Sequence, residues 1–272
     1  MNIPPIVERV YWHIGYTKAA STYLQQWFAQ SSAVYFDPMR PGWNHFVKQS
    51  DASFNLNTAK LWVAEHIRSA RDKPVLFSHE RLSGNPHSGH YDQMEIARRI
   101  KQVTPNAHII VVTRERTDLL KSIYRQYIRA GGGRTASQYF NQQWDGRTPR
   151  FNFAPYDYAN VMAQYYRIFG QDNVTLAKFE DLKANETAFQ ANLINQTGLS
   201  LTPQVIGQVN SSLTDAELKT RWIDNVMGDV GLVSLCDPLQ LMHGAPDKLK
   251  RELREWLAAK WQNDYVQIIN SL

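Results

Sequence analysis

The chain has 272 residues, of which 43% are hydrophobic and 20% are charged, and its formal net charge is +5. This composition is that of a globular protein and excludes a disordered chain. The single cysteine, Cys236, excludes an intramolecular disulfide framework and a zinc or redox site built on paired cysteines.

Four short apolar runs predict buried strands, because each is bounded by polar or turn residues. They cover residues 7–14, 75–78, 108–113 and 174–178. Amphipathic patterns between and after them predict helices over residues 19–30, 92–103, 117–130 and 156–169. Strands that alternate with helices indicate a parallel sheet with helices on both faces. We therefore expect an α/β fold.

From about residue 186 onward the strand pattern disappears, and helices are expected over residues 186–197, 214–227 and 247–269. No linker divides the chain, so we expect one domain over residues 1–272 with a helical carboxyl-terminal portion. Residues 36–57 and 131–155 look irregular, and the second segment is a candidate flap, since long irregular connections are often functional.

Membrane and secretion signals are lacking in the sequence as given. No run approaches the roughly 18 apolar residues of a membrane-spanning helix, and the first residues lack the apolar core of a signal peptide. The expected protein has no membrane span and is cytoplasmic.

The first place where chemistry concentrates is the turn between the first predicted strand and its helix. Lys18 lies in this turn, and Ser21 and Thr22 lie at the start of the helix. A helix start offers unpaired N–H groups and the positive end of the helix dipole, which together bind phosphate-like groups. The spacing is not that of a Walker A motif, which reads GxxxxGK[ST]. The alternative is an ordinary turn that happens to contain a lysine.

The second place follows the third predicted strand, where Arg114 is succeeded eight residues later by Ser122. Ligands of parallel α/β sheets lie at the carboxyl ends of the strands, so both places open onto one edge. This arrangement suits a ligand with two separated phosphate-like groups. Residues 114–134 also carry six basic groups and two acidic ones, which indicates an anionic ligand or a solvated helix face.

Both segments resemble motifs of the sulfotransferase family. Residues 16–23, YTKAASTY, are similar to the 5′-phosphosulfate loop, which reads YPKSGTTW in cytosolic members. The step from Arg114 to Ser122 is similar to the family's 3′-phosphate motif. Residues 169–182 resemble the FGxxNV strand and its acidic turn, and residues 209–212 with Arg221 resemble the bacterial and heparan-type carbohydrate branch. The resemblance covers roughly residues 9–225.

This resemblance implies a P-loop-like parallel sheet and the cofactor 3′-phosphoadenosine 5′-phosphosulfate (PAPS), with 3′-phosphoadenosine 5′-phosphate (PAP) as product and no metal. Lys18 would contact the bridging oxygen, and Arg114 and Ser122 would bind the 3′-phosphate. The residues that would cradle the 5′-phosphate are Ala19, Ala20, Ser21 and Thr22.

Two positions in the loop depart from the cytosolic motif. Ala20 stands where that motif has glycine, and Thr17 stands where it has proline. Because alanine resists a positive φ, either the loop keeps ordinary helical geometry or cofactor binding is weaker. The cytosolic RKGxxGxWK segment is absent, which argues against that branch.

An acceptor hydroxyl must lose a proton during transfer, so a general base is expected at the same edge. The second predicted strand leads into Ser78-His79-Glu80, which resembles the S-x-E segment of bacterial and heparan-type sulfotransferases. Glu80 is the first candidate for the base and His79 the second. The alternative for Glu80 is a structural ion pair with Arg81 or Arg114.

Three histidines, an acidic turn and several aromatic residues are further candidates for a ligand site or for the lining of the acceptor pocket. His79, His87 and His90 fit no standard zinc spacing, so we expect no metal site. The turn at Glu180 and Asp181 is expected to be structural, because carboxylates repel a sulfated nucleotide. Candidates for the acceptor pocket are residues 84–91, Trp43, His45, Tyr124 and Tyr127.

The function that these patterns and the resemblance favour is transfer of a sulfuryl group from PAPS to a hydroxyl of a carbohydrate or glycolipid. The expected partner is a small-molecule or glycan acceptor, not a nucleic acid. Two alternatives stay open: a nucleotide or small-molecule kinase of P-loop ancestry, and a non-catalytic binder of nucleotides or RNA.

Overall fold

The computed structural model describes residues 6, 8–40, 42–141, 144–145, 148–149, 151–206, 213–233 and 247–272. Two compact units make up the chain. The first comprises residues 1–116 and 152–209, and the second comprises residues 117–151 and 210–272. The expectation of a single domain over residues 1–272 stays a prediction.

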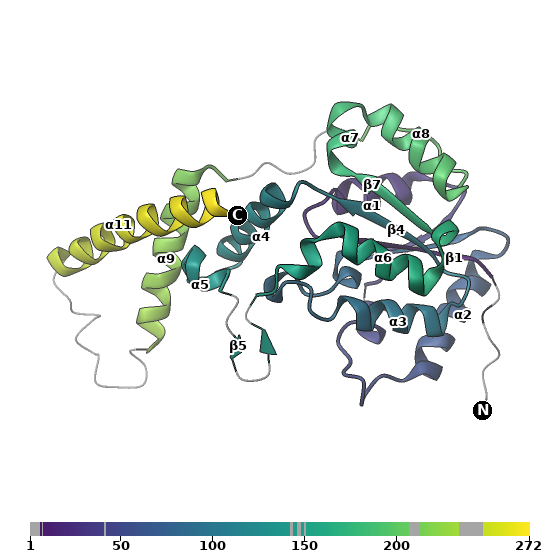
Figure 1. Cartoon of the computed structure of the whole chain (residues 1–272), viewed down its shortest axis with the longest axis horizontal. Helices are drawn as coiled ribbons and strands as arrows, with labels where there is room; N and C mark the ends of the chain where they lie inside the picture. The colour runs from purple at the N-terminus through teal and green to yellow at the C-terminus, as the bar shows by residue number, and fades with distance from the viewer. Residues whose placement is uncertain are drawn as a thin grey trace. The chain divides into compact units, whose positions relative to one another are not determined.

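The first unit is built on a five-stranded sheet with the order β2-β3-β1-β4-β7, in which every neighbouring pair is parallel (Figure 1). The strands are β1 (Val10–Gly15), β2 (Tyr35–Asp37), β3 (Val75–Ser78), β4 (His108–Thr113) and β7 (Val174–Lys178). All four predicted strands are confirmed, although β1 begins at Val10 and not at residue 7. The prediction missed β2, which lies partly in the segment read as irregular.

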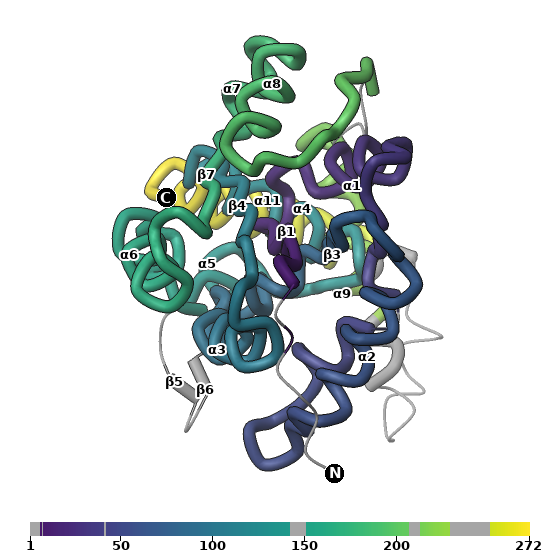
Figure 2. Tube along the Cα trace, turned by 90° about the vertical axis from the view of Figure 1, so that its right-hand side faces the viewer, coloured from purple at the N-terminus to yellow at the C-terminus, as the bar shows by residue number. Residues whose placement is uncertain are grey.

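Helices cover both faces of this sheet, as the α/β prediction requires. In both views α1 (Ser21–Gln30), α7 (Phe179–Ala184) and α8 (Glu186–Thr197) lie on one side, and α2 (Leu56–Ala70) and α3 (Gln93–Val103) lie on the other (Figure 2). The sixth helix of this unit is α6 (Tyr158–Phe169). Every residue of β1, β3 and β4 is buried, which explains why these strands read as continuous apolar runs and not as alternating ones.

The sequence prediction missed α2 and α7. Only Ala59, Val63 and Ala70 of α2 are buried, so its apolar stripe is too thin to be read from the sequence. Asn55 caps this helix by accepting a hydrogen bond from the Thr58 amide at 2.9 Å. The described part of the first unit also contains five short 3₁₀ helices: η1 (Gly42–His45), η2 (Glu80–Ser83), η3 (Pro86–Ser88), η4 (Ala154–Tyr156) and η5 (Gln171–Asn173).

The second unit contains most of α4 (Arg116–Arg129), with α5 (Ala136–Tyr139), α9 (Asp215–Val233), α11 (Asp247–Ser271) and a hairpin of β5 (Trp144–Asp145) and β6 (Thr148–Pro149). Its core is aromatic, formed by Tyr124, Tyr139, Phe140, Trp222, Trp261 and Tyr265. Tyr124 is fully buried there and its hydroxyl donates to the Arg134 carbonyl at 2.9 Å. Its prediction as a residue of the acceptor pocket is therefore wrong.

Several features named from the sequence are not described by the structure. Cys236 and residues 209–212 lie outside the described residues, and so do positions 142–143, 146–147 and 150 of the candidate flap. The rest of that segment contains α5 and the hairpin, so it is not wholly irregular. Within the described part of the chain, no helix combines the length and apolar character needed to cross a membrane.

Candidate active site

Two neighbouring strands of the sheet send their connections in opposite directions. The chain runs from β1 through α1 to β2 at one edge of the sheet, and from β4 it continues toward β7 at the other edge. Ligands of open α/β sheets bind outside the carboxyl ends of the strands at such a point. Both sequence motifs that bear chemistry start here, at Gly15 and at Thr113.

The loop from Gly15 to Ser21 curls tightly, because three of its residues have positive φ. Gly15 has φ 96°, Lys18 has φ 67° and Ala20 has φ 62°. The Tyr16 amide donates to the Val112 carbonyl at 2.9 Å, which ties the loop to β4. The Ala19 amide then donates back to the Tyr16 carbonyl at 3.1 Å. This geometry turns the chain from the buried strand directly into α1.

The amino terminus of α1 has no cap from its own N-cap residue. That residue is Ala20, whose side chain has no acceptor, and the Ser21 hydroxyl donates to the Tyr16 carbonyl at 3.1 Å. The first amides of a helix have no intrahelical partner, so the amides of Ser21, Thr22 and Tyr23 remain as donors. Together with the helix dipole they form a binding place for an anion.

The conformation of Ala20 contradicts the expectation of ordinary helical geometry in this loop, and weaker cofactor binding stays a prediction. Its φ of 62° and ψ of 14° are left-handed, so the loop does not keep ordinary helical geometry. The alanine instead adopts the conformation that glycine would have in the motif, at a cost of about 1 kcal/mol. Strain of this kind is stored where the surrounding structure imposes the conformation, often at functional sites.

Arg114 joins the second motif to the first. Its Nη1 donates to the Lys18 carbonyl oxygen at 3.2 Å, and its guanidinium lies over the ring of Phe179 at 5.0 Å. The Tyr158 hydroxyl donates to the Arg114 carbonyl at 2.9 Å and fixes the backbone at the end of β4. The two motifs are therefore in contact, at a place where an anion on the loop would face a guanidinium.

The acidic turn after β7 contains Glu180 and Asp181, which we expected to be structural because carboxylates repel a sulfated nucleotide. The Glu115 amide donates to Oε1 of Glu180 at 2.9 Å, so this carboxylate holds the backbone that follows Arg114. Ser122 and Arg221 belong to the second unit, in α4 and α9, and the 3′-phosphate role of Ser122 stays a prediction.

Glu80 lies against the start of the loop. A Cβ on Gly15 would lie 3.2 Å from the Glu80 Cα, so only glycine allows this approach as well as the positive φ. The His79 amide donates to the His13 carbonyl at 3.1 Å and continues the pairing of β3 with β1. Within the described part of the chain, the half-buried Glu80 carboxylate makes no hydrogen bond or ion pair, so the proposed pairing with Arg81 or Arg114 does not occur.

His79 has a different environment, because its ring is engaged. Its Nδ1 accepts a hydrogen bond from the Arg81 amide at 3.1 Å, and the ring stacks on Trp43 at 5.1 Å. Burial lowers the pKa of His79, and the charges of Arg40 and Arg81 lower it further against the opposing effect of Glu80. A neutral imidazole with an accepting Nδ1 carries its proton on Nε2. That nitrogen is then a donor and not a base.

The other two histidines named from the sequence also have structural partners. His90 donates from Nδ1 to the Ser83 carbonyl at 2.6 Å, and burial lowers its pKa to about 3. Burial and the charge of Arg81 lower the pKa of His87. Among the residues that the structure describes, no group of three or more histidine, cysteine or acidic side chains is arranged to hold a metal ion.

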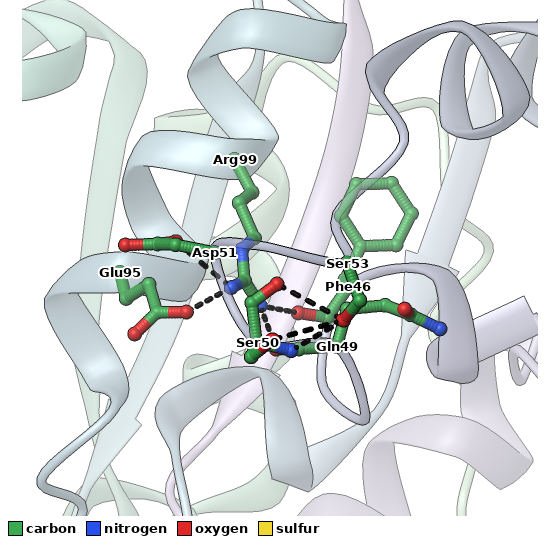
Figure 3. Close-up of polar contacts among 7 residues, drawn as sticks. All are labelled: Phe46, Gln49, Ser50, Asp51, Ser53, Glu95 and Arg99. Carbon is green, nitrogen blue, oxygen red and sulfur yellow. Dashed lines mark hydrogen bonds and ion pairs between the residues drawn. The ribbon is translucent and has the colours of Figure 1, made fainter.

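The segment that carries Trp43 is held by a buried arginine that sequence reasoning missed. Arg99 of α3 donates to the carbonyl oxygens of Phe46 and Gln49, both at 2.8 Å, and pairs with Asp51 at 3.0 Å and with Glu95 (Figure 3). The spacing of Glu95 and Arg99 by four residues was visible in the sequence, but it resembles an ordinary surface pair on a helix. Arg99 is only 3% exposed, so this cluster fixes the loop beside His79.

Comparisons with known proteins place the fold. No protein-family model matches this chain, and no curated protein sequence matches it. Among solved structures, a sulfotransferase from Alicyclobacillus acidocaldarius is similar with a TM-score of 0.53 and 14% identity, over 85% of this chain and 96% of that chain. This likeness shows that the chain has the sulfotransferase fold.

Two further solved structures are similar at lower TM-scores. The sulfotransferase domain from the curacin biosynthetic pathway has a TM-score of 0.47 and 12% identity, over 80% of this chain and 83% of that domain. Mouse sulfotransferase SULT7A1, complexed with PAP, has a TM-score of 0.43 and 11% identity, over 81% of this chain and 64% of that one.

Proposed function

We propose that this protein, which has the sulfotransferase fold, is an enzyme that transfers a sulfuryl group from PAPS to a hydroxyl group of an acceptor. One observation carries the proposal: the strained loop from Gly15 to Ser21 leads into the amino terminus of α1 and lies against the backbone of Glu80, whose carboxylate has no partner among the described residues. An anion site next to a base is what in-line transfer to a hydroxyl needs.

The residues of the loop fit the 5′ end of such a nucleotide. The amides of Ser21 and Thr22 are donors at a helix start, and the Thr17 hydroxyl is buried without a hydrogen-bond partner among the described residues. We assign the backbone of Ala19 and Ala20, with Ser21 and Thr22, to the 5′-phosphate, and Lys18 to the bridging oxygen. PAPS supplies the sulfuryl group, and no metal is assigned a role.

Arg114 and Ser122 are assigned to the 3′-phosphate. The contact of Arg114 with the Lys18 carbonyl supports the assignment, because it places a guanidinium beside the loop that would bind the 5′ end. A guanidinium is suited to phosphate by its planar fork of donors.

Glu80 and not His79 is assigned as the general base. The Glu80 carboxylate has no hydrogen bond or ion pair with a described residue, whereas Nδ1 of His79 is occupied by the Arg81 amide. The acceptor that we propose is a carbohydrate or glycolipid, that is, a small molecule or a glycan and not a nucleic acid.

The test is a transfer assay with labelled PAPS and mixed glycan and glycolipid acceptors, in the presence of a metal chelator. We expect label transfer by the wild-type protein and by Arg98→Gln, a control on the exposed face of α3. Glu80→Gln should lose about 100-fold or more, which is the usual contribution of a general base. Phosphoryl transfer from ATP with magnesium, together with no transfer from PAPS, would contradict this proposal and favour the alternative function, a kinase of P-loop ancestry.

A further inference from the structure

The guanidinium of the half-buried Arg81 has no hydrogen-bonding partner among the described residues. Its Nε is buried and unpartnered, and its guanidinium makes no hydrogen bond or ion pair with any residue that the structure describes. The Nε of Arg99 is also buried without a hydrogen bond, but the Nη nitrogens of Arg99 donate to two carbonyls and two carboxylates (Figure 3). The guanidinium of Arg81 differs from that of Arg99 because none of its donors has an acceptor among the described residues, and this difference needs an explanation.

Nearby carboxylates do not supply the missing partners. Burial lowers the pKa of Arg81, and Asp92 and then Glu80 oppose this effect by their charge, but neither lies within ion-pair distance. Asp92 is already engaged, since its Oδ1 accepts from the Asn85 amide at 2.7 Å. The guanidinium therefore keeps a buried Nε without an acceptor, and its two Nη nitrogens make no hydrogen bond with a described residue.

The position of Arg81 connects these donors to the proposed reaction. Glu80 and Arg81 are the first two residues of η2. Because they are consecutive in the chain, their Cα atoms are about 3.8 Å apart. Two further cations lie in this region: the charge of Arg40 lowers the pKa of His79, and Lys48 Nζ lies over the ring of Trp43 at 4.6 Å. A ligand held by Arg81 would lie beside the carboxylate that we assign as the base.

We propose that Arg81 binds an anionic oxygen group of the acceptor, so that the substrate is a hydroxyl compound that also carries a carboxylate or a sulfate ester. This inference rests on the proposed function and names its substrate class. The guanidinium fork pairs with two oxygens of such a group and orients the neighbouring hydroxyl toward Glu80.

The transfer step balances with these groups. The hydroxyl proton passes to the Glu80 carboxylate, and the acceptor oxygen forms a bond to sulfur. The bond from sulfur to the bridging oxygen breaks, and PAP leaves with that electron pair. Arg81 takes no part in these bond changes, so it determines specificity and orientation and is not a catalytic residue.

Direct binding is tested by the ¹⁵N nuclear magnetic resonance signal of the Arg81 Nε–H group, assigned with Arg81→Gln. The probes are methyl glucuronoside, methyl glucoside 6-sulfate and 4-hydroxybenzoate, beside neutral methyl glucoside and phenol, with and without PAP. We expect a saturable shift with at least one anionic probe and none with its neutral counterpart. No shift with any anionic probe would overturn the inference, while absent PAP binding would contradict the proposed function instead.

Kinetics give a second, independent readout with whichever acceptors are turned over. Arg81→Gln should lower kcat/KM for an anionic acceptor about tenfold or more, through a raised KM and a lowered kcat, whereas Arg98→Gln should change neither constant. Arg81→Lys should restore part of the loss. Equal kcat/KM of wild type and Arg81→Gln for the anionic acceptor would overturn the inference. So would loss of folding in Arg81→Gln, because it would show a structural role.

Discussion

The guanidinium of Arg114, at the end of β4, donates a hydrogen bond to the carbonyl oxygen of Lys18, in the loop after β1, at 3.2 Å. Ninety-six positions separate the two residues in the sequence. They meet because β1 and β4 are parallel neighbours whose carboxyl ends lie at one edge of the sheet. This contact makes the loop and the second motif parts of one site.

Arg114→Ala should weaken PAP binding by about tenfold to a hundredfold, since charge-assisted hydrogen bonds contribute about 1.5–3 kcal/mol. Titration calorimetry with PAP measures this loss directly. Arg68→Ala, an exposed change in the last turn of α2, is the matched control and should bind PAP like the wild type. Equal losses in both variants would point to a general charge effect and not to a site contact.

Ala20→Gly should stabilise the protein, because it relieves an alanine held at φ 62°. The expected gain is about 1 kcal/mol, or roughly 2–4 °C in Tm for a chain of this size. Ala19→Gly is the matched control and should lower the stability of the protein. Ala19 is fully buried and has no positive φ, so this change removes a packed methyl group without relieving strain. Thermal unfolding of the two variants checks both signs, and a loss of stability in Ala20→Gly would contradict the left-handed loop.

Glu80→Gln should lower kcat about 100-fold or more while PAP affinity and Tm stay near wild type. The reason is that this carboxylate makes no hydrogen bond or ion pair with a described residue, so the amide disturbs no structural contact. His79→Gln should lower kcat much less, and its principal effect should be on stability, through the lost cap of η2 and the lost stacking on Trp43. A reversed order of the two kcat losses would move the base to His79.

Stability should fall as the pH is lowered below about 6.5, the ordinary pKa of histidine. Burial lowers the pKa of both His13 and His90 to about 3, so the unfolded chain binds protons that the folded one excludes. Stability then rises with pH between these values, and at pH 5 each histidine costs about 2 kcal/mol relative to pH 7. Urea unfolding of wild type and His90→Gln at pH 7 and pH 5 checks this, since the variant should lose less stability on acidification.

Much of the fold was predictable because its strands are apolar on both faces. The bounds predicted for β3, β4 and β7 agree with the structure, since each run ends abruptly at polar residues. The three residues of β2 are only half-buried, so they leave no comparable pattern. The meeting of Lys18 and Arg114 at one edge followed from the parallel order of the strands.

The conformation and pairing of single residues were not predictable in this way. The local preference of alanine opposes the φ of Ala20, so only the surrounding structure can impose it. The missing partners of Arg81, the acceptance of a hydrogen bond by His79 and the cluster at Arg99 depend on contacts between distant segments or on burial. Short spacings such as Glu95 to Arg99 were visible in the sequence, but they do not show which side chains are buried or which contacts form.

The central claim is that the loop after β1 and the arginine after β4 together bind a nucleotide with two separated anionic ends. Calorimetric titration with PAP without metal, beside a titration with ATP and magnesium, tests it most directly. We expect micromolar binding of PAP, a much weaker response to ATP with magnesium, and a weakened PAP response in Arg114→Ala. Preference for ATP with magnesium, or PAP binding that Arg114→Ala leaves unchanged, would contradict it.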